Sequence, residues 1–179
     1  MAKLVLEDGA EYIGVSFGHN SAATGEIVFQ TGMVGYVESL TDPSYYGQIL
    51  VLTYPLIGNY GVQAKLYTKD KLIKTPFQSD KIQVRAVIVG DYIDDMSHWT
   101  AERTLSQWLK EEGVPAITGV DTRALTKRLR ENGTMLGQIV QSKGELIETI
   151  PDPNKENLIA TVSCKVTNQI TYIICLFIY

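Results

Sequence analysis

The sequence predicts a mixed α/β domain in which most of the strands precede the helices. Short runs of β-branched and apolar residues recur through the first half of the chain, as is typical of strands. Two later segments instead carry apolar side chains at the spacing of one helix face. The length of 179 residues corresponds to one domain, with little room for a second.

The expected strands are separated by residues that favour turns. A hairpin is predicted where two apolar runs flank Asp8-Gly9, and the small, polar run 18–25 is expected to be a loop. The run 49–53 is apolar on both faces, which indicates a central strand. Residues 63–81 carry several lysines and are interpreted as a solvated connection that could hold a short helix. The remaining predicted strands comprise residues 26–30, 84–89, 115–118 and 135–140.

Two helices are expected, each with an N-cap and a glycine stop. Ser97 is the expected cap of the first helix, which would end at Gly113. Asp121 or Thr122 is expected to cap the second helix, which would end at Gly133. The inward faces are formed by Ala101, Leu105, Trp108 and Leu109 in the first helix and by Ala124, Leu125 and Leu129 in the second.

Composition argues against several classes of protein. Hydrophobic residues make up 45% and charged residues 20%, which is typical of a globular chain. The formal net charge of −4 argues against a nucleic-acid-binding surface. Cys164 and Cys175 are too few for a disulfide framework or a four-cysteine zinc site. The first residues lack the apolar core of a signal peptide, so we expect a cytoplasmic location.

The last part of the chain differs in composition. Pro151-Asp-Pro153 is interpreted as a domain edge, and no charged residue follows Lys165. Residues 170–179 are apolar at every position except Thr171. This run is shorter than the ~17–25 residues that span a bilayer, so no membrane segment is expected. Its high β propensity and lack of charge are typical of an aggregation-prone segment.

No self-contained catalytic or metal-binding set is evident in the sequence. The glycines of 32–35 and 58–61 match neither a Walker sequence nor a dinucleotide fingerprint, so turns are the favoured interpretation. His19 and His98 are not matched by a nucleophile in a suitable motif. Asp94-Asp95 could bind a cation but lacks the spacing of an oxygen-ligand loop. We therefore predict no catalytic residue and no metal ligand in this chain.

Two other features are candidates for binding. Asp42-Pro43 fits the first two positions of a type I turn, in which the carboxylate can accept turn amides and proline presets φ. One surface of the second helix is basic, and the residues alone leave open whether it docks a partner or is simply solvated. This surface carries Arg123, Lys127, Arg128 and Arg130.

Seven blocks carry a resemblance to a known family: Leu4–Gly9, Gly25–Tyr36, Leu40–Tyr45, Leu52–Gly61, Ser97–Trp99, Gly119–Arg130 and Gly133–Gly137. In this order they resemble the N-terminal domain of the small chain of glutamine-dependent carbamoyl-phosphate synthase. The resemblance runs from about residue 3 to residue 164. Its wording is most similar to the eukaryotic form that is fused into the multifunctional pyrimidine-pathway protein.

The resemblance implies a swivelling β/β/α-type domain that precedes a glutaminase domain. In this family the glutaminase releases ammonia from glutamine, and the synthetase portion uses ATP and Mg²⁺ to make carbamoyl phosphate from ammonia and bicarbonate. The partners expected here are these two portions, with no cofactor in this chain. The resemblance also implies that Ser44 contacts glutamine, supported by the turn of Asp42, Pro43 and Tyr45. A serine that only caps the turn is the alternative.

The chain departs from the family because the sequence contains no glutaminase domain. We interpret residues 1–155 as the family domain, 156–165 as the start of a linker and 166–179 as an apolar tail foreign to the family, and hypothesise a truncated gene model or a retained intron. The expected function is an accessory docking domain in pyrimidine or arginine supply, inactive alone. Arg123, Lys127 and Arg130 would form its docking surface. The alternative is a non-catalytic fragment that binds the synthetase portion without supporting activity.

Overall fold

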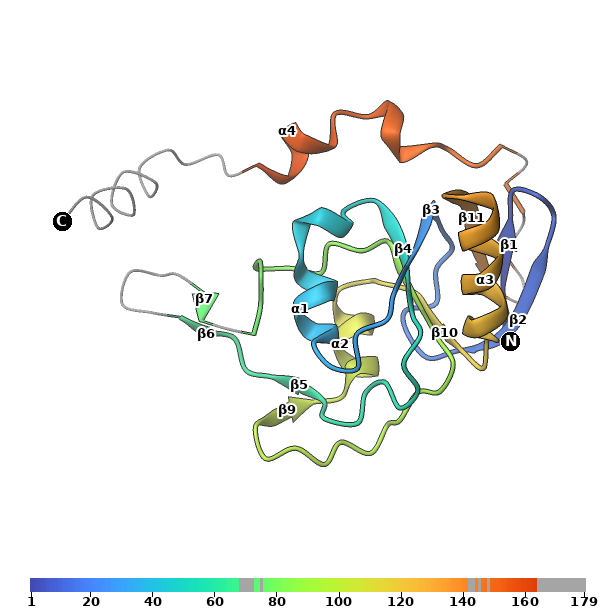
Figure 1. Ribbon diagram of the computed structural model, residues 1–179. Coiled ribbons are helices and arrows are strands. Elements are labelled where there is room, and N and C mark those ends of the chain that lie inside the picture. The colour runs from blue at the N-terminus through green and yellow to red at the C-terminus, as the bar shows by residue number, and fades with distance from the viewer. Residues whose placement is uncertain (68–72, 75, 142–143, 145, 148, 164–179) are drawn as a thin grey trace.

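The strands pair into a closed barrel. The computed structural model (Figure 1) describes residues 1–67, 73–74, 76–141, 144, 146–147 and 149–163. Around the barrel, neighbouring strands follow the order β1 (Ala2–Leu6), β11 (Met135–Gln141), β3 (Ala23–Gln30), β4 (Gln48–Leu52), β8 (Ala86–Val89), β10 (Ala116–Thr118) and β2 (Glu11–Ser16). The expected mixed α/β class is confirmed, whereas the swivelling type remains a prediction.

One part of the barrel is parallel. β3, β4, β8 and β10 pair in parallel, and β1, β2 and β11 join them through antiparallel pairs. The carboxyl ends of the four parallel strands therefore meet at one edge of the barrel. Because Gln30 lies opposite Leu52 in the register, the residues that follow β3 and β4 lie side by side at that edge.

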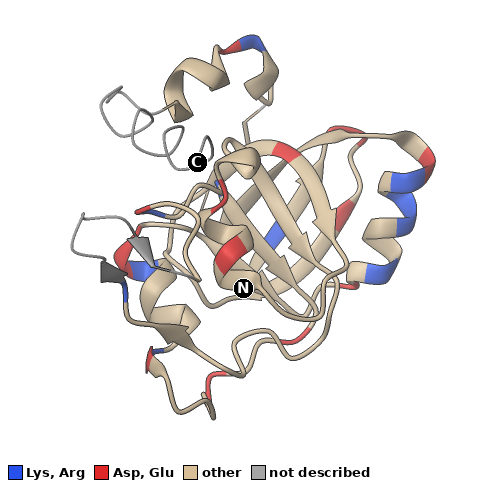
Figure 2. Cartoon of the chain, turned by 60° about the vertical axis from the view of Figure 1, so that its left-hand side comes forward, with Lys and Arg blue, Asp and Glu red and all other residues tan. Residues whose placement is uncertain are grey.

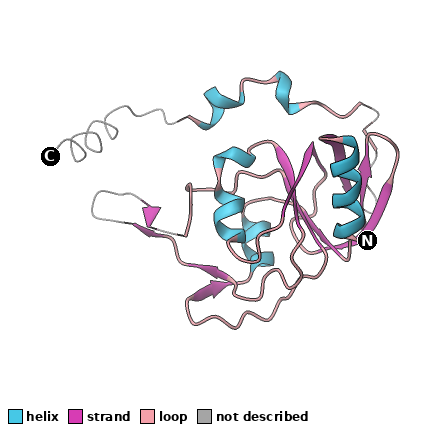
Figure 3. Cartoon of the chain, in the orientation of Figure 1, coloured by secondary structure: helices cyan, strands magenta, loops and turns pink. Residues whose placement is uncertain are grey.

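β4 separates two hydrophobic clusters, as the expected central strand should. Leu50 and Leu52 belong to the cluster that includes helices α1 (Tyr36–Thr41) and α2 (Leu105–Glu111). Ile49 and Val51 face the other cluster, which includes residues of helix α3 (Thr122–Asn132). Figure 3 shows the same division, with α1 and α2 on one side of the strands and α3 on the other. Period-two alternation thus buries both faces of this strand.

The first of the two expected helices begins later than predicted. Residues Ala101–Arg103 form strand β9, which pairs with β5 (Val62–Gln63), and α2 begins only after them. Thr104 is the N-cap, because its hydroxyl accepts from Gln107 N at 3.2 Å while the Gln107 side chain accepts from Thr104 N at 3.0 Å. Ser97 instead donates to the carbonyl of Asn59. The capping box and the pairing with β5 together override the helical spacing.

The second expected helix is confirmed as α3. Asp121 accepts from Ala124 N at 2.9 Å, and the chain leaves the helix at Gly133, where φ is +84°. Leu125 and Leu129 are buried, as predicted. Ala124 is exposed, so its assignment to the inward face was wrong. Thr122 and Thr126 are the buried small residues of this helix instead.

Long-range pairing also corrects two expected loops. β3 begins at Ala23, before the predicted start, because Ala23 to Gly25 pair with β11. Within 63–81, β6 (Leu66–Tyr67) pairs with β7 (Ile73–Lys74). Phe77 is buried against Trp108, with ring centroids 5.6 Å apart. The interpretation of this stretch as a purely solvated connection was therefore wrong at Phe77.

Part of the chain after β11 lies near the end of η1 (Pro43–Tyr45). It contains η2 (Pro153–Lys155) and α4 (Leu158–Val162), and Pro153 lies against Gly47. The predicted domain edge near Pro151 and the linker remain predictions. Both cysteines and the apolar tail 166–179 lie outside the described residues. Among the residues that are described, no helix is long and apolar enough to cross a membrane.

Candidate functional site

The predicted turn around Ser44 has the expected local structure. The Asp42 carboxylate accepts from Ser44 N at 2.8 Å, and Pro43 occupies the first position of η1. Asp42 is also the C-cap of α1, with its N–H donating to the Ser39 carbonyl. The expectation that Asp42 accepts a turn amide is therefore confirmed. One carboxylate holds the junction at which α1 ends and the Ser44 turn begins.

Ser44 is exposed at the surface of this turn. The hydrogen bond from Ser44 N–H to the Asp42 carboxylate fixes the backbone conformation from which the Ser44 side chain projects. Tyr45 packs partly against the α1–α2 cluster and anchors the other side of the turn. A short turn fixed on both sides presents a hydroxyl at low ordering cost. The contact with glutamine remains a prediction.

Helix α1, which the sequence analysis did not identify, supports this turn from the other end. Its N-cap Gly35 provides no capping side chain and has a φ of +88°. The Tyr60 hydroxyl oxygen supplies the missing acceptor: it accepts hydrogen bonds from Gly35 N at 2.9 Å and from Tyr36 N at 3.0 Å. Tyr36 is buried and donates to the Gly61 carbonyl at 2.6 Å. Burial raises the pKa of both tyrosines, so both phenols are neutral donors or acceptors here.

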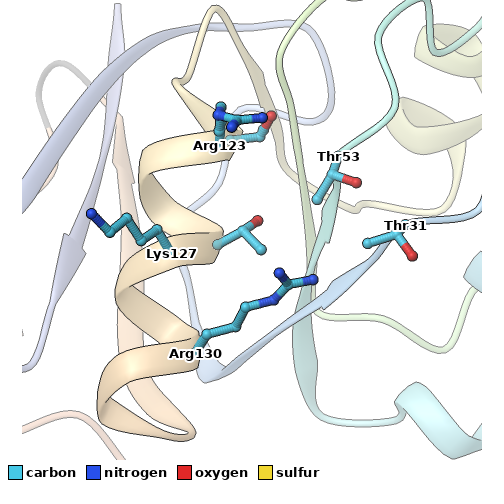
Figure 4. A pocket seen from close by; sticks show the side chains of 7 residues that line it. Thr31, Thr53, Arg123, Lys127 and Arg130 are labelled. Atoms are coloured by element: carbon cyan, nitrogen blue, oxygen red, sulfur yellow. The ribbon is translucent and has the colours of Figure 1, made fainter.

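The predicted basic residues of α3 lie along a groove. Arg123, Lys127 and Arg130 all line this groove, whose volume is about 420 Å³. Figure 2 shows that Lys and Arg recur along α3. Arg130 extends from the helix toward Thr31 and Thr53, whereas Lys127 projects to the opposite side of the helix in this view (Figure 4). The structure therefore places the three predicted basic residues along one groove, but the side chains of Lys127 and Arg130 point in different directions.

Four threonines complete the lining of the groove, and the sequence analysis missed them. Thr31 and Thr53 directly follow β3 and β4, and Thr122 and Thr126 belong to α3. Thr53 donates its hydroxyl to the Gln30 carbonyl at 3.0 Å. A usable signal was present, because polar residues directly after two parallel strands meet at one sheet edge. Finding it required the order of the strands, which the sequence does not state.

The remaining candidates are local surface features. The His19 ring pairs with the Ser21 hydroxyl at 3.1 Å, and His98 pairs with Thr100 at 2.7 Å, both in exposed positions. Asp94 accepts from the Tyr92 hydroxyl at 2.5 Å, which uses one carboxylate of the acidic pair in a local contact. Within the described ranges, no group of three histidine, cysteine or acidic side chains could hold a metal ion.

Comparison with known proteins identifies the family. The family model described as carbamoyl-phosphate synthase small chain, CPSase domain, matches residues 4–139. The chain belongs to the carbamoyl-phosphate synthase small-chain family. The matched range includes most of the barrel, the Ser44 turn and α3; it begins within β1 and ends within β11.

Curated relatives of this carbamoyl-phosphate synthase domain agree. The chain is 49% identical over 186 residues to the multifunctional protein pyrABCN of Emericella nidulans, covering 92% of this chain and 8% of that protein. It is 52% identical over 167 residues to the multifunctional protein CAD of Squalus acanthias, covering 92% and 7%. Identity to the mitochondrial carbamoyl-phosphate synthase [ammonia] of Mus musculus is 50% over 164 residues, covering 92% and 11%. The chain thus spans about a tenth or less of the length of these relatives.

A comparison of folds adds nothing to this assignment. An aminopeptidase from Aneurinibacillus sp. strain AM-1 superposes with a TM-score of 0.43 at 14% identity, over 81% of this chain and 31% of that one. Similarity at this level carries no argument about function.

Proposed function

We propose that this chain is the accessory domain of a glutamine-hydrolysing carbamoyl-phosphate synthase. The observation that carries the proposal is the family match over residues 4–139, which contains the fixed turn of Ser44. In this proposal the glutaminase domain supplies the nucleophile, and the synthetase portion uses ATP and Mg²⁺. This chain contributes a wall of the glutamine site and a docking surface. Its location would be the cytoplasm, and its product would enter pyrimidine or arginine synthesis.

Ser44 is the residue proposed to contact glutamine. An exposed hydroxyl can donate one hydrogen bond and accept up to two, which suits the neutral amide of glutamine. Its backbone is held by Asp42 and Tyr45, so little conformational freedom is lost on binding. The role is positioning, because a lone hydroxyl without a base is a weak nucleophile.

The basic face of α3 is proposed as the docking surface for the synthetase portion. Arg123, Lys127 and Arg130 are exposed, and the ion pair of Lys127 with Glu131, at 3.9 Å, is its only one among the described residues. Replacing all three with glutamate should abolish capture of the synthetase portion in a pull-down. Lys110→Glu on α2 is the matched control, because it reverses an exposed charge on another helix. Capture by the triple variant at the parent level would contradict docking through this face.

The test of the main proposal combines this chain with separately expressed glutaminase and synthetase portions of a family member. The chain alone should release no ammonia from glutamine, and the combination should form carbamoyl phosphate from glutamine. Ser44→Ala should raise the KM for glutamine by about tenfold, the effect of one lost hydrogen bond to the substrate, and leave ammonium-dependent synthesis unchanged. Ser163→Ala, at another exposed serine, is the control.

Three outcomes separate the alternatives. Glutamine hydrolysis by the chain alone would contradict the accessory role. Capture of the synthetase portion without any synthesis would favour the non-catalytic fragment instead. Synthesis with ammonium but none with glutamine would contradict glutamine use, and would agree with the name of the mouse relative, which specifies ammonia.

A further inference from the structure

The groove between α3 and the ends of β3 and β4 contains hydrogen-bond donors that have no partner among the residues the structure describes. We propose that it binds a phosphate group, either as the free ion or as part of a small phosphate ester. The proposal goes beyond the accessory function and does not depend on it, because binding is measured on this chain alone.

The groove lies at the edge where the parallel strands end. In α/β sheets and barrels, ligands commonly bind outside the carboxyl ends of the parallel strands, since loops and helix starts converge there. Thr31 and Thr53 occupy this edge, and α3 begins at the same edge, directly after β10. Figure 4 shows Arg130 reaching from α3 toward both threonines. Side chains from three separate elements therefore surround one space.

Thr126 supplies the independent observation that the groove is built to bind. It lines the groove, is only 8% exposed, and its Oγ1 has no hydrogen-bond partner in the described part of the chain. A buried hydroxyl is normally satisfied, and a threonine within a helix can donate to the carbonyl four residues earlier. Thr41 does so in α1, where its hydroxyl donates to Val37 O at 2.8 Å. Thr126 does not, so its buried hydroxyl is unpartnered beside the groove within the described residues.

The charge of the groove favours an anion. Neither Arg123 nor Arg130 has a carboxylate partner among the described residues, and no acidic side chain lines the groove. Arg130 lies over the Phe29 ring, at 5.3 Å from the centroid, which holds its guanidinium near the strand ends. Guanidinium groups pair with carboxylate or phosphate through two parallel hydrogen bonds.

The number of donors favours phosphate over a carboxylate. Two guanidinium groups and the side chains of Thr31 and Thr126 line the groove. A carboxylate presents two oxygens in one plane, whereas a phosphate presents three or four oxygens in a tetrahedron. A volume of about 420 Å³ leaves room for the remainder of a small ester.

The test is a titration of the ¹⁵N-labelled chain of 179 residues, followed by its amide NMR shifts. Sodium phosphate, glycerol phosphate and sodium acetate are added in separate arms, with chloride adjusted to keep ionic strength constant. We expect saturable shifts at the amides of α3 and at Thr31 and Thr53 with phosphate or the ester. Stronger binding of the ester indicates a phosphorylated metabolite, and equal or weaker binding indicates free phosphate.

Variants distinguish a built site from general attraction to a basic helix. Arg130→Gln should weaken phosphate binding by about tenfold, and Thr126→Val should do the same. Thr126→Val should also leave the protein as stable as the parent, because it removes a buried hydroxyl that lacks a partner. Lys110→Gln, on another helix, should leave phosphate affinity unchanged.

The proposal is overturned by any of three results. These are the absence of saturable shifts with both phosphate and the ester, tighter binding of acetate than of phosphate, and unchanged phosphate affinity in folded Thr126→Val and Arg130→Gln. The second result would indicate an acidic peptide as the ligand. Should Arg130→Gln fail to fold, Thr126→Val alone decides.

Discussion

The phenol of Tyr60 stacks on the ring of Tyr36, with centroids 4.1 Å apart and planes inclined by 16°, and its oxygen accepts from Tyr36 N at 3.0 Å. The same oxygen accepts from Gly35 N at 2.9 Å. A side chain distant in sequence thus caps α1, a task that a serine or aspartate at the N-cap usually performs. The helix that leads to the Ser44 turn therefore depends on a tertiary contact.

Removal of this oxygen should destabilise the domain. In Tyr60→Phe the stacked ring remains, but two amides lose their acceptor, so the free energy of unfolding should fall by about 1–3 kcal/mol. Urea denaturation measures the change. Tyr54→Phe is the control, because the Tyr54 hydroxyl has no partner among the described residues, and it should be nearly neutral. Equal stability of the two variants would show that Tyr60 does not cap α1.

Stability should decline at alkaline pH because of buried tyrosines. Burial raises the pKa of Tyr36 above its ordinary value, so the folded chain retains a proton that the unfolded chain loses above about pH 10. The stabilisation is complete below that pH, and it should be lost as the pH rises, by up to about 1.4 kcal/mol per pH unit for this residue.

The measurement compares the parent with Tyr36→Phe in urea between about pH 8 and pH 11. The variant is expected to be less stable at pH 8, because it lacks the hydrogen bond to Gly61 O, but to lose less stability as the pH rises. Parallel pH profiles for both proteins would contradict the assignment to Tyr36.

The Asp42 carboxylate should matter as an acceptor and not as a charge. Asp42→Ala removes the acceptor of Ser44 N and should lower the free energy of unfolding by about 1 kcal/mol. Asp42→Asn retains an acceptor oxygen and should remain close to the parent. In the assembled enzyme, Asp42→Ala should also raise the KM for glutamine. The ranking is refuted if the asparagine variant is as unstable as the alanine variant.

Two variants test where α2 begins. Thr104→Ala removes one half of the capping box and should cost about 1 kcal/mol in stability, whereas Thr104→Ser should restore it. Ser97→Ala should cost less, because Ser97 makes only an exposed contact to Asn59 O at 3.2 Å. Thermal or urea denaturation checks this order. A larger loss in Ser97→Ala would restore the earlier helix start that the sequence predicted.

The features that could be predicted depend on residues close together in the sequence. Asp121 and Gly133 bound α3 by capping rules that act within a few residues, and Asp42 caps its turn in the same way. The alternating burial of β4 follows from an unbroken apolar run. The prediction failed at Ala101, where helical spacing coincided with a residue whose hydrogen bonds go to β5.

Residue patterns alone were enough to predict the α/β class, the boundaries of α3, the turn of Ser44 and the resemblance to the carbamoyl-phosphate synthase small-chain family. The three-dimensional arrangement was needed to show that Tyr60 caps α1, that Phe77 enters the core, and that Thr31, Thr53 and Thr126 share a groove with Arg130. The two sets of features differ in the sequence separation of the residues that interact. Capping and periodicity act between near neighbours, whereas the order of parallel strands brings together residues that no local pattern relates.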